Sequence, residues 1–256
     1  MNIKAFLFSA FLALSLNAAE KIVVAATPVP HAEILEEVKA DLKAQGYELV
    51  IKEFNDYIQP NIATDNKEVD ANFFQHIPYM QEFNNIRKTK LVIVGGIHIE
   101  PMAVYSKKFK SLEDVKNGAL IAVPNDPTNE SRALDLIAKT GLISFKNDNA
   151  LKTPLDIKDN PKNLKFSELK AAQVPRVLSD ADFAIINSNY ALSAKLNPVK
   201  DSVLIESSES PYVNVLVTRQ GRENEAKIQA LLKALQSQKV KDFILKKYEG
   251  SVVPAF

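Results

Sequence analysis

"KIVVAATPVPHAEILEEVKADLKAQGYELVIKEF" occupies Lys21–Phe54 and sets the pattern of the fold. The stretch Lys21–Thr27 predicts a buried strand. Apolar residues then recur at helical spacing as far as Gly46, a residue that suits a helix end. Tyr47–Phe54 predicts a second strand. A strand, a helix and a strand in this order favour a parallel strand pair with the helix packed on the sheet.

The same alternation continues to the end of the chain. Further helices are predicted at 78–87, 128–141 and 188–196, with two more meeting near Ser237 inside 223–248. Further strands are predicted at 69–76, 90–106, 119–124, 183–187 and 210–219. Strands that alternate with helices predict an α/β fold with a parallel-rich sheet and helices on its faces.

The composition is that of a globular protein without a dominant charge. The chain has 256 residues, of which 46% are hydrophobic, and its 32 basic residues nearly balance its 31 acidic ones. This balance lacks the basic excess that nucleic acid attracts, so no nucleic-acid partner is predicted. There is no cysteine, so stability is expected to come from the core rather than from disulfides.

Residues 1–19 have the composition of a secretory signal peptide. Lys4 is their only charge, Ala5–Leu16 is an apolar run, and small residues follow it. We expect cleavage after Ala19, with Ala18 as the second choice. The run is shorter than the roughly 20 residues that span a bilayer, although a membrane-anchoring helix is the alternative. Without cysteine there is no diacylglyceryl attachment, so the exported protein is expected to be soluble and periplasmic.

Polar and aromatic residues follow four of the predicted strands. Ligand sites in α/β sheets lie at the carboxyl ends of the strands, so these residues are expected to share one concave site. The four groups are Asn55–Tyr57, Phe74–His76, Asn125–Asn129 and Asn187–Tyr190.

The segment "VPNDPTNESRAL" (Val123–Leu134) is expected to bind an anion. Thr128 or Asn129 can cap the helix that follows, and free N–H groups at a helix start favour negative charge. Arg132 adds a fork of donors that fits a carboxylate. The alternative for Arg132 is a solvated side chain on a helix face, and Arg176 is a rival for the anion.

At this point the sequence resembles the NlpA/MetQ family, the methionine-uptake group of substrate-binding proteins of ABC importers. The resemblance runs over nearly the whole chain after the signal. It is carried by "TPVPHAEIL", "FNDYIQPN", "DANFFQHIPY", "PMAVYSKK", "VPNDPTN", "NPKNLKF", "VPRVL", "INSNYA" and "ESPYVNVLVTR". Family members are commonly lipoproteins, whereas this chain lacks the lipid-bearing cysteine.

The resemblance implies a two-lobe periplasmic-binding-protein fold of type II, with two crossover strands. Carried onto this chain, lobe 1 is 20–105 plus 215–256, and lobe 2 is 106–214. It also implies a free amino acid as ligand, usually methionine, and delivery to an ABC transporter permease with its ATPase at the inner membrane. L-methionine, D-methionine, a methionine dipeptide and another apolar amino acid all stay open. We expect a monomer without a cofactor.

The resemblance also implies a set of ligand-binding residues. Arg132 would hold the carboxylate with Asn129 beside it, and Asn187 and Asn214 would bind the amino and carboxylate groups. The side-chain pocket would be walled by Tyr57, Phe74, His76 and Tyr79.

Two other readings of the sequence stay open. His98 and Glu100 form a His-x-Glu pair, which could suggest a metal ligand set. The chain has three histidines and no cysteine, so no dedicated metal site is predicted. His31 is either structural or part of the ligand site. No catalytic motif or phosphate-binding glycine loop occurs, so we predict no enzyme activity. A periplasmic dehydratase or lyase on the same two-lobe fold, or an adhesion protein, are the alternatives.

Overall fold

The structure is a computed structural model of the chain, and it describes residues 19–256. The predicted signal peptide therefore lies outside the described residues, apart from Ala19. The first strand, β1, begins at Glu20, directly after the preferred cleavage site.

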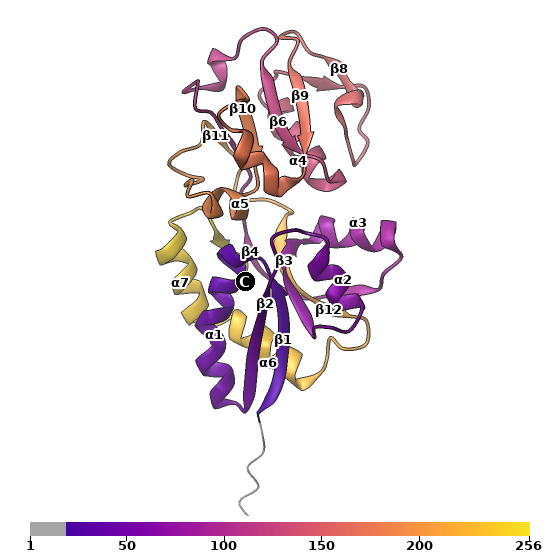
Figure 1. Ribbon diagram of the computed structural model, residues 1–256, viewed down its shortest axis with the longest axis vertical. Helices are drawn as coiled ribbons and strands as arrows, with labels where there is room; N and C mark the ends of the chain where they lie inside the picture. The colour runs from indigo at the N-terminus through magenta and orange to yellow at the C-terminus, as the bar shows by residue number, and fades with distance from the viewer. Residues whose placement is uncertain (1–18) are drawn as a thin grey trace, which may run out of the picture.

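The chain forms two lobes, each built on its own sheet (Figure 1). The first lobe holds the indigo N-terminal strands and the yellow C-terminal helices, and the pink and orange middle of the chain forms the second. The first sheet has, in spatial order, β13 (Val253–Pro254), β4 (Leu91–Ile99), β12 (Val213–Arg219), β3 (Ala71–His76), β1 (Glu20–Ala26) and β2 (Tyr47–Glu53). The second has β11 (Leu204–Ile205), β5 (Ala103–Tyr105), β10 (Phe183–Ile186), β6 (Leu120–Pro124) and β9 (Lys165–Leu169). A separate hairpin pairs β7 (Ser144–Phe145) with β8 (Ile157–Asp159).

Both sheets are mixed rather than parallel throughout. β1 runs parallel to β2 and β3, and β6 runs parallel to β9 and β10. The strands that connect the lobes break this pattern, because β12 is antiparallel to β3 and β4, and β5 is antiparallel to β10.

Helices cover both faces of the first sheet. The helices are η1 (Pro28–Ala32), α1 (Glu33–Ala44), α2 (Gln59–Asp65), α3 (Ile77–Arg87), α6 (Ala226–Leu235) and α7 (Gln238–Tyr248). Leu35 of α1 and Leu231 of α6 are fully buried in one core cluster with Phe73 of β3. On the other face, Met80 and Phe83 of α3 pack with Val215 and Val217 of β12. The sheet is therefore buried on both sides, as the apolar strands predict.

The second sheet is also covered on both faces. Its helical elements are η2 (Leu112–Asp114), α4 (Pro127–Ala138), η3 (Pro154–Asp156), η4 (Ala171–Val177) and α5 (Ser188–Ser193). Leu134 and Ile137 of α4 pack against Ile121 of β6 in one cluster, and Val174 of η4 packs with Ile186 of β10 in another. This packing fixes α4 against the strand that precedes it, and so fixes where Arg132 lies.

Two segments carry the chain between the sheets. β4 leads through residues 100–102 into β5, and β11 leads through residues 206–212 into β12. The predicted lobe boundaries, which lie after Tyr105 and after Asn214, stay a prediction. The strand pairing assigns Ala103–Tyr105 to the second sheet and Val213–Arg219 to the first.

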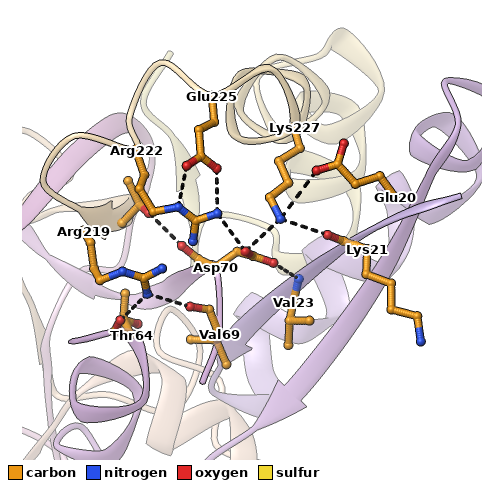
Figure 2. A network of polar contacts seen from close by, with 11 residues as sticks. Glu20, Lys21, Val23, Thr64, Val69, Asp70, Arg219, Arg222, Glu225 and Lys227 are labelled. Carbon is orange, nitrogen blue, oxygen red and sulfur yellow. Dashed lines mark hydrogen bonds and ion pairs between the residues drawn. The ribbon is translucent and has the colours of Figure 1, made fainter. Parts of the chain in front are cut away.

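A polar network surrounds Asp70, the residue that precedes strand β3 in the first sheet (Figure 2). The Asp70 carboxylate accepts hydrogen bonds from the Val23 N–H at 2.8 Å and from Arg222 at 3.0 Å, and it pairs with Lys227 at 2.9 Å. Burial opposes ionisation of Asp70, but the Val23 N–H and the two cations hold its pKa below the usual value. The network thus joins β1, the start of β3 and the segment after β12.

Among residues 19–256, no helix has both the length and the apolar character that crossing a membrane requires.

Candidate functional site

A cavity lies between the two lobes, and residues of both lobes line it. The structure brings all the site residues predicted from the sequence to its wall: Tyr57, Phe74, His76, Tyr79, Asn129, Arg132, Asn187 and Asn214. Four further residues complete the wall: Gln75, Glu100, Ser188 and Asn189.

The start of helix α4 differs from the sequence prediction. Asp126, rather than Thr128 or Asn129, caps the helix, and its carboxylate accepts the Asn129 N–H at 3.0 Å. Pro127 then occupies the first helical position, where its missing N–H is harmless. Arg132 consequently lies in the second turn, and the cap carboxylate already occupies the helix start that we expected to bind an anion.

Arg132 is held in place by groups of its own chain. Its Nε donates to Glu206 Oε1 at 3.2 Å, and its Nη2 donates to Glu206 Oε2 and, at 2.8 Å, to the backbone oxygen of Glu100. The guanidinium also lies over the ring of Tyr212, 4.1 Å from the centroid. The side chain is only 4% exposed, and within residues 19–256 Nη1 makes no hydrogen bond. Nη1 is therefore the donor that Arg132 has left for a ligand.

Arg176 occupies a different environment from Arg132. It lies in η4, is exposed, and does not line the cavity. Of the two arginines considered for the anion, only Arg132 lies at the site.

The three predicted asparagines differ in whether both polar atoms of the side-chain amide have a hydrogen-bond partner. Asn129 Oδ1 accepts from Asn187 Nδ2 at 2.8 Å and from His76 Nε2 at 3.1 Å, while its Nδ2 donates to Asp126. Asn187 Oδ1 is buried and has no hydrogen-bond partner among the described residues. Asn214 Oδ1 faces His31 Nε2 at 3.1 Å. Asn129 thus positions its neighbours, whereas the amide oxygen of Asn187 and the amide nitrogen of Asn214 are available to a ligand.

Three aromatic rings form the apolar part of the wall. The ring of Tyr57 lies 6.0 Å from that of Phe74 and 5.7 Å from that of Tyr79, and the rings of Phe74 and Tyr79 lie 6.1 Å apart. The Tyr79 hydroxyl donates to the backbone oxygen of Tyr57 at 3.0 Å. These contacts fix the rings around a space suited to an apolar side chain.

His76 is a wall residue whose ring nitrogens are both occupied. Nδ1 accepts the Tyr79 N–H at 3.1 Å, which caps helix α3, so Nε2 carries the proton and donates to Asn129. Burial, helped by the charge of Arg132, lowers the pKa of His76 to about 3. His76 is therefore neutral, and it serves both as the cavity wall predicted from the sequence and as the cap of helix α3.

His31, His98 and Glu100 meet beneath the cavity. Glu100 Oε1 lies 2.8 Å from His98 Nε2 and 3.2 Å from His31 Nε2, and all three side chains are buried. Around a tetrahedral zinc ion with bonds of about 2.0–2.1 Å, neighbouring ligand atoms lie about 3.3 Å apart. The 2.8 Å separation fits a hydrogen bond better, so the geometry favours a hydrogen-bonded cluster.

Within residues 19–256, hydrogen bonds join the two lobes beside the cavity. The Tyr57 hydroxyl donates to Asn189 Oδ1 at 2.6 Å, the Tyr190 hydroxyl reaches the backbone oxygen of Asn55 at 3.3 Å, and His76 meets Asn129. Each bond joins one lobe to the other, so the structure has the lobes closed on the cavity.

Three of the four further lining residues belong to the strand-end groups that the sequence predicted to share one site. Gln75 lies in the group Phe74–His76, although its amide serves a buried cluster with Asn61 and Asn72. Ser188 and Asn189 lie in the group Asn187–Tyr190. Glu100 had no such signal, because its neighbours in the site come from distant parts of the chain.

A two-lobed α/β chain with two connecting segments and a cavity between its lobes is a substrate-binding protein of the periplasmic type. The chain belongs to the NlpA lipoprotein family, whose model matches residues 22–256. The family predicted from the sequence motifs is thereby confirmed.

Several relatives resemble the chain over most of their length. The methionine-binding lipoprotein MetQ of Bacillus subtilis (strain 168) is 45% identical over 241 residues, which cover 92% of this chain and 88% of the relative. The D-methionine-binding lipoprotein MetQ of Escherichia coli (strain K12) is 44% identical, with 87% and 82% covered. A solved nutrient-binding protein from Burkholderia cenocepacia, bound to methionine, matches with a TM-score of 0.89 at 47% identity, covering 92% of this chain and 100% of that one.

Proposed function

We propose that this protein captures methionine or a close analogue and delivers it to the permease of an ABC importer, which works with its own ATPase. The observation that carries the proposal is the cavity between the lobes, whose wall includes both Arg132 and a cluster of three aromatic rings. The names of the relatives and the methionine bound to the Burkholderia protein support the same ligand class. These relatives are named as binding proteins, which favours this reading over a dehydratase or lyase.

The wall offers separate places for the two ends of an amino acid. Arg132 Nη1 and Asn214 Nδ2 are donors for the carboxylate, and a charge-assisted bond of this kind is stronger than a neutral one. Tyr57, Phe74 and Tyr79 surround the side chain. A thioether is polarizable and makes favourable contacts with aromatic edges, so methionine suits this wall.

Titration calorimetry with L-methionine tests the function directly. We expect a dissociation constant of micromolar or below, equivalent to roughly −8 kcal/mol or better. The same titration with D-methionine, a methionine dipeptide and leucine ranks the ligands that the sequence leaves open. Mass spectrometry of the recovered ligand should find it unchanged, since turnover would indicate an enzyme. If none of these compounds produced either binding heat or a thermal shift, that result would contradict the proposal.

We also infer that the protein is exported by cleavage of residues 1–19. The support is the signal-like composition of this segment and the start of strand β1 at Glu20. N-terminal sequencing of protein from an osmotic-shock fraction should therefore begin at Glu20 or Ala19. Recovery of the uncleaved chain in the membrane pellet after a high-salt wash would count against this inference.

A further inference from the structure

Glu206 pairs with the Arg132 guanidinium although it does not line the ligand cavity. Its Oε1 accepts from Arg132 Nε at 3.2 Å, and its Oε2 accepts from Nη2. The carboxylate thus occupies one whole edge of the planar guanidinium. Arg132 lines the cavity and also a separate surface groove, and Glu206 lines only the groove. The ion pair therefore connects the cavity wall to a residue that the ligand does not reach.

Glu206 is itself fixed where the two segments that connect the lobes meet. Its N–H donates to the backbone oxygen of Met102 at 2.9 Å, and its Oε2 accepts the Met102 N–H at 3.2 Å. Met102 belongs to the connecting segment 100–102, whereas Glu206 begins the segment 206–212. Arg132 also contacts both segments, because it donates to the Glu100 backbone oxygen and lies over the ring of Tyr212. A side chain of helix α4 is therefore held by both connections between the lobes.

The pairing with Glu206 fixes the direction of the one nitrogen of Arg132 that is left for a ligand. The guanidinium donors form a rigid, planar fork, so holding the Nε–Nη2 edge also orients Nη1. A carboxylate can accept both prongs of this edge, whereas an amide would turn a donor toward one of them. Replacing a buried ion pair with apolar residues is often neutral for stability, so stability alone explains the pair poorly. Orientation of the guanidinium is the role that the geometry favours.

We propose that Glu206 is a positioning residue for the ligand carboxylate, which it orders by holding Arg132 so that Nη1 is presented to the ligand. The proposal rests on the amino-acid-binding function proposed above and adds a residue that acts on the ligand only through Arg132. Without the Glu206 carboxylate, the guanidinium can rotate and its directed bond to the ligand carboxylate is weakened. A ligand that lacks the carboxylate should therefore depend little on Glu206.

The first test compares two ligands by calorimetry on the parent and on Glu206→Gln. The ligands are L-methionine and L-methioninol, in which a hydroxymethyl group replaces the carboxylate. The glutamine keeps the size of the side chain and one acceptor oxygen, but it loses the charge and the second acceptor. Methionine affinity should fall about 10- to 100-fold, as for a lost hydrogen bond to a charged group, and methioninol affinity should change less than about threefold. A purely structural role of Glu206 would lower both affinities equally.

The second test needs methionine alone and removes the residue through which Glu206 acts. On the Arg132→Ala background, Glu206→Gln should leave methionine affinity unchanged or raise it, because an unpaired Glu206 carboxylate repels that of the ligand. Glu209→Gln, at an exposed position of the same connecting segment, is the matched control and should bind both ligands like the parent.

The outcomes separate this proposal from the function on which it rests. Unchanged methionine affinity in Glu206→Gln would overturn the proposal, as would an equal loss of both ligands. A further loss of methionine affinity on the Arg132→Ala background would overturn it too. A Glu206→Gln protein that does not fold would assign Glu206 to stability and count against the proposal in the same way. A parent that binds no methionine would instead overturn the proposed function.

Discussion

Replacing Arg132 with alanine is expected to weaken methionine binding by roughly 30- to 4,000-fold. Truncating one partner of a buried charge pair costs about 2–5 kcal/mol, and each 1.4 kcal/mol is a factor of ten. Arg132 is 4% exposed at the cavity wall, so little water would replace it beside the ligand carboxylate. Arg132→Lys should recover little, because one ammonium cannot reach Glu206, the Glu100 backbone and the ligand together.

The ion pair with Glu206 means that Arg132→Ala also affects the fold. Glu206 is 10% exposed, and losing its partner leaves a nearly buried charge, so this variant should melt at a lower temperature than the parent. The double variant Arg132→Ala/Glu206→Gln removes the unpaired charge as well. It should regain much of the melting temperature but not the affinity, which separates the loss of ligand contact from the loss of stability.

Arg176→Ala serves as the matched control for this experiment. Arg176 is exposed and lies outside the cavity, so its removal should leave binding unchanged. If Arg132→Ala bound methionine like the parent while Arg176→Ala did not, the carboxylate would have been assigned to the wrong arginine. The loop before α4 would then serve only to cap the helix.

Replacing Phe73 with alanine is expected to destabilise the first lobe by about 3–5 kcal/mol. Phe73 of β3 is fully buried in the largest core cluster, and its removal leaves a cavity between the sheet and helix α1. For a chain of this size each kcal/mol lowers the melting temperature by about 2–4 °C, so a fall of about 6–20 °C is expected in a thermal scan.

Phe73→Ala should also weaken ligand binding, because the same ring supports the cluster under the cavity. Its edge packs against His31, with centroids 4.8 Å apart, and against His98 at 5.3 Å. Without this support the two donors that position Glu100 lose their fixed orientation. Phe256→Ala, at a side chain 37% exposed, is the control and should change stability by less than about 0.5 kcal/mol. A melting temperature within 2 °C of the parent's for Phe73→Ala would contradict the role assigned to this residue.

Features decided by neighbouring residues could be read from the sequence alone. The spacing of apolar residues from Lys21 to Phe54 predicted strand, helix and strand, and β1, α1 and β2 follow in that order. Ser237 separates α6 from α7 as predicted, because its hydroxyl accepts the Val240 N–H and caps the second helix. Each of the four polar groups predicted to follow strands contributes at least one residue to the cavity wall, since strand ends share an edge of the sheet.

Local signals were less decisive where several residues competed for one role. Asp126, Thr128 and Asn129 can all cap a helix, and the choice of Asp126 follows from Pro127, which suits the first helical position. Strand β9 escaped prediction because Lys165–Leu169 is short, partly exposed and flanked by other polar residues. Its pairing with β6, rather than its own composition, makes it a strand.

Only the tertiary structure decided which groups of the site remain free for a ligand. Arg132 was identified from its own loop, but its pairing with Glu206 joins residues 74 positions apart. His31 and Asn214, which meet beside Glu100, are separated by 183 positions. A side chain's donors and acceptors are defined by residue type, whereas their occupancy depends on partners that folding brings within about 3 Å. The sequence therefore determined which functional groups line the cavity. The packing of the two lobes decided which of their donors and acceptors remain without a partner in the protein.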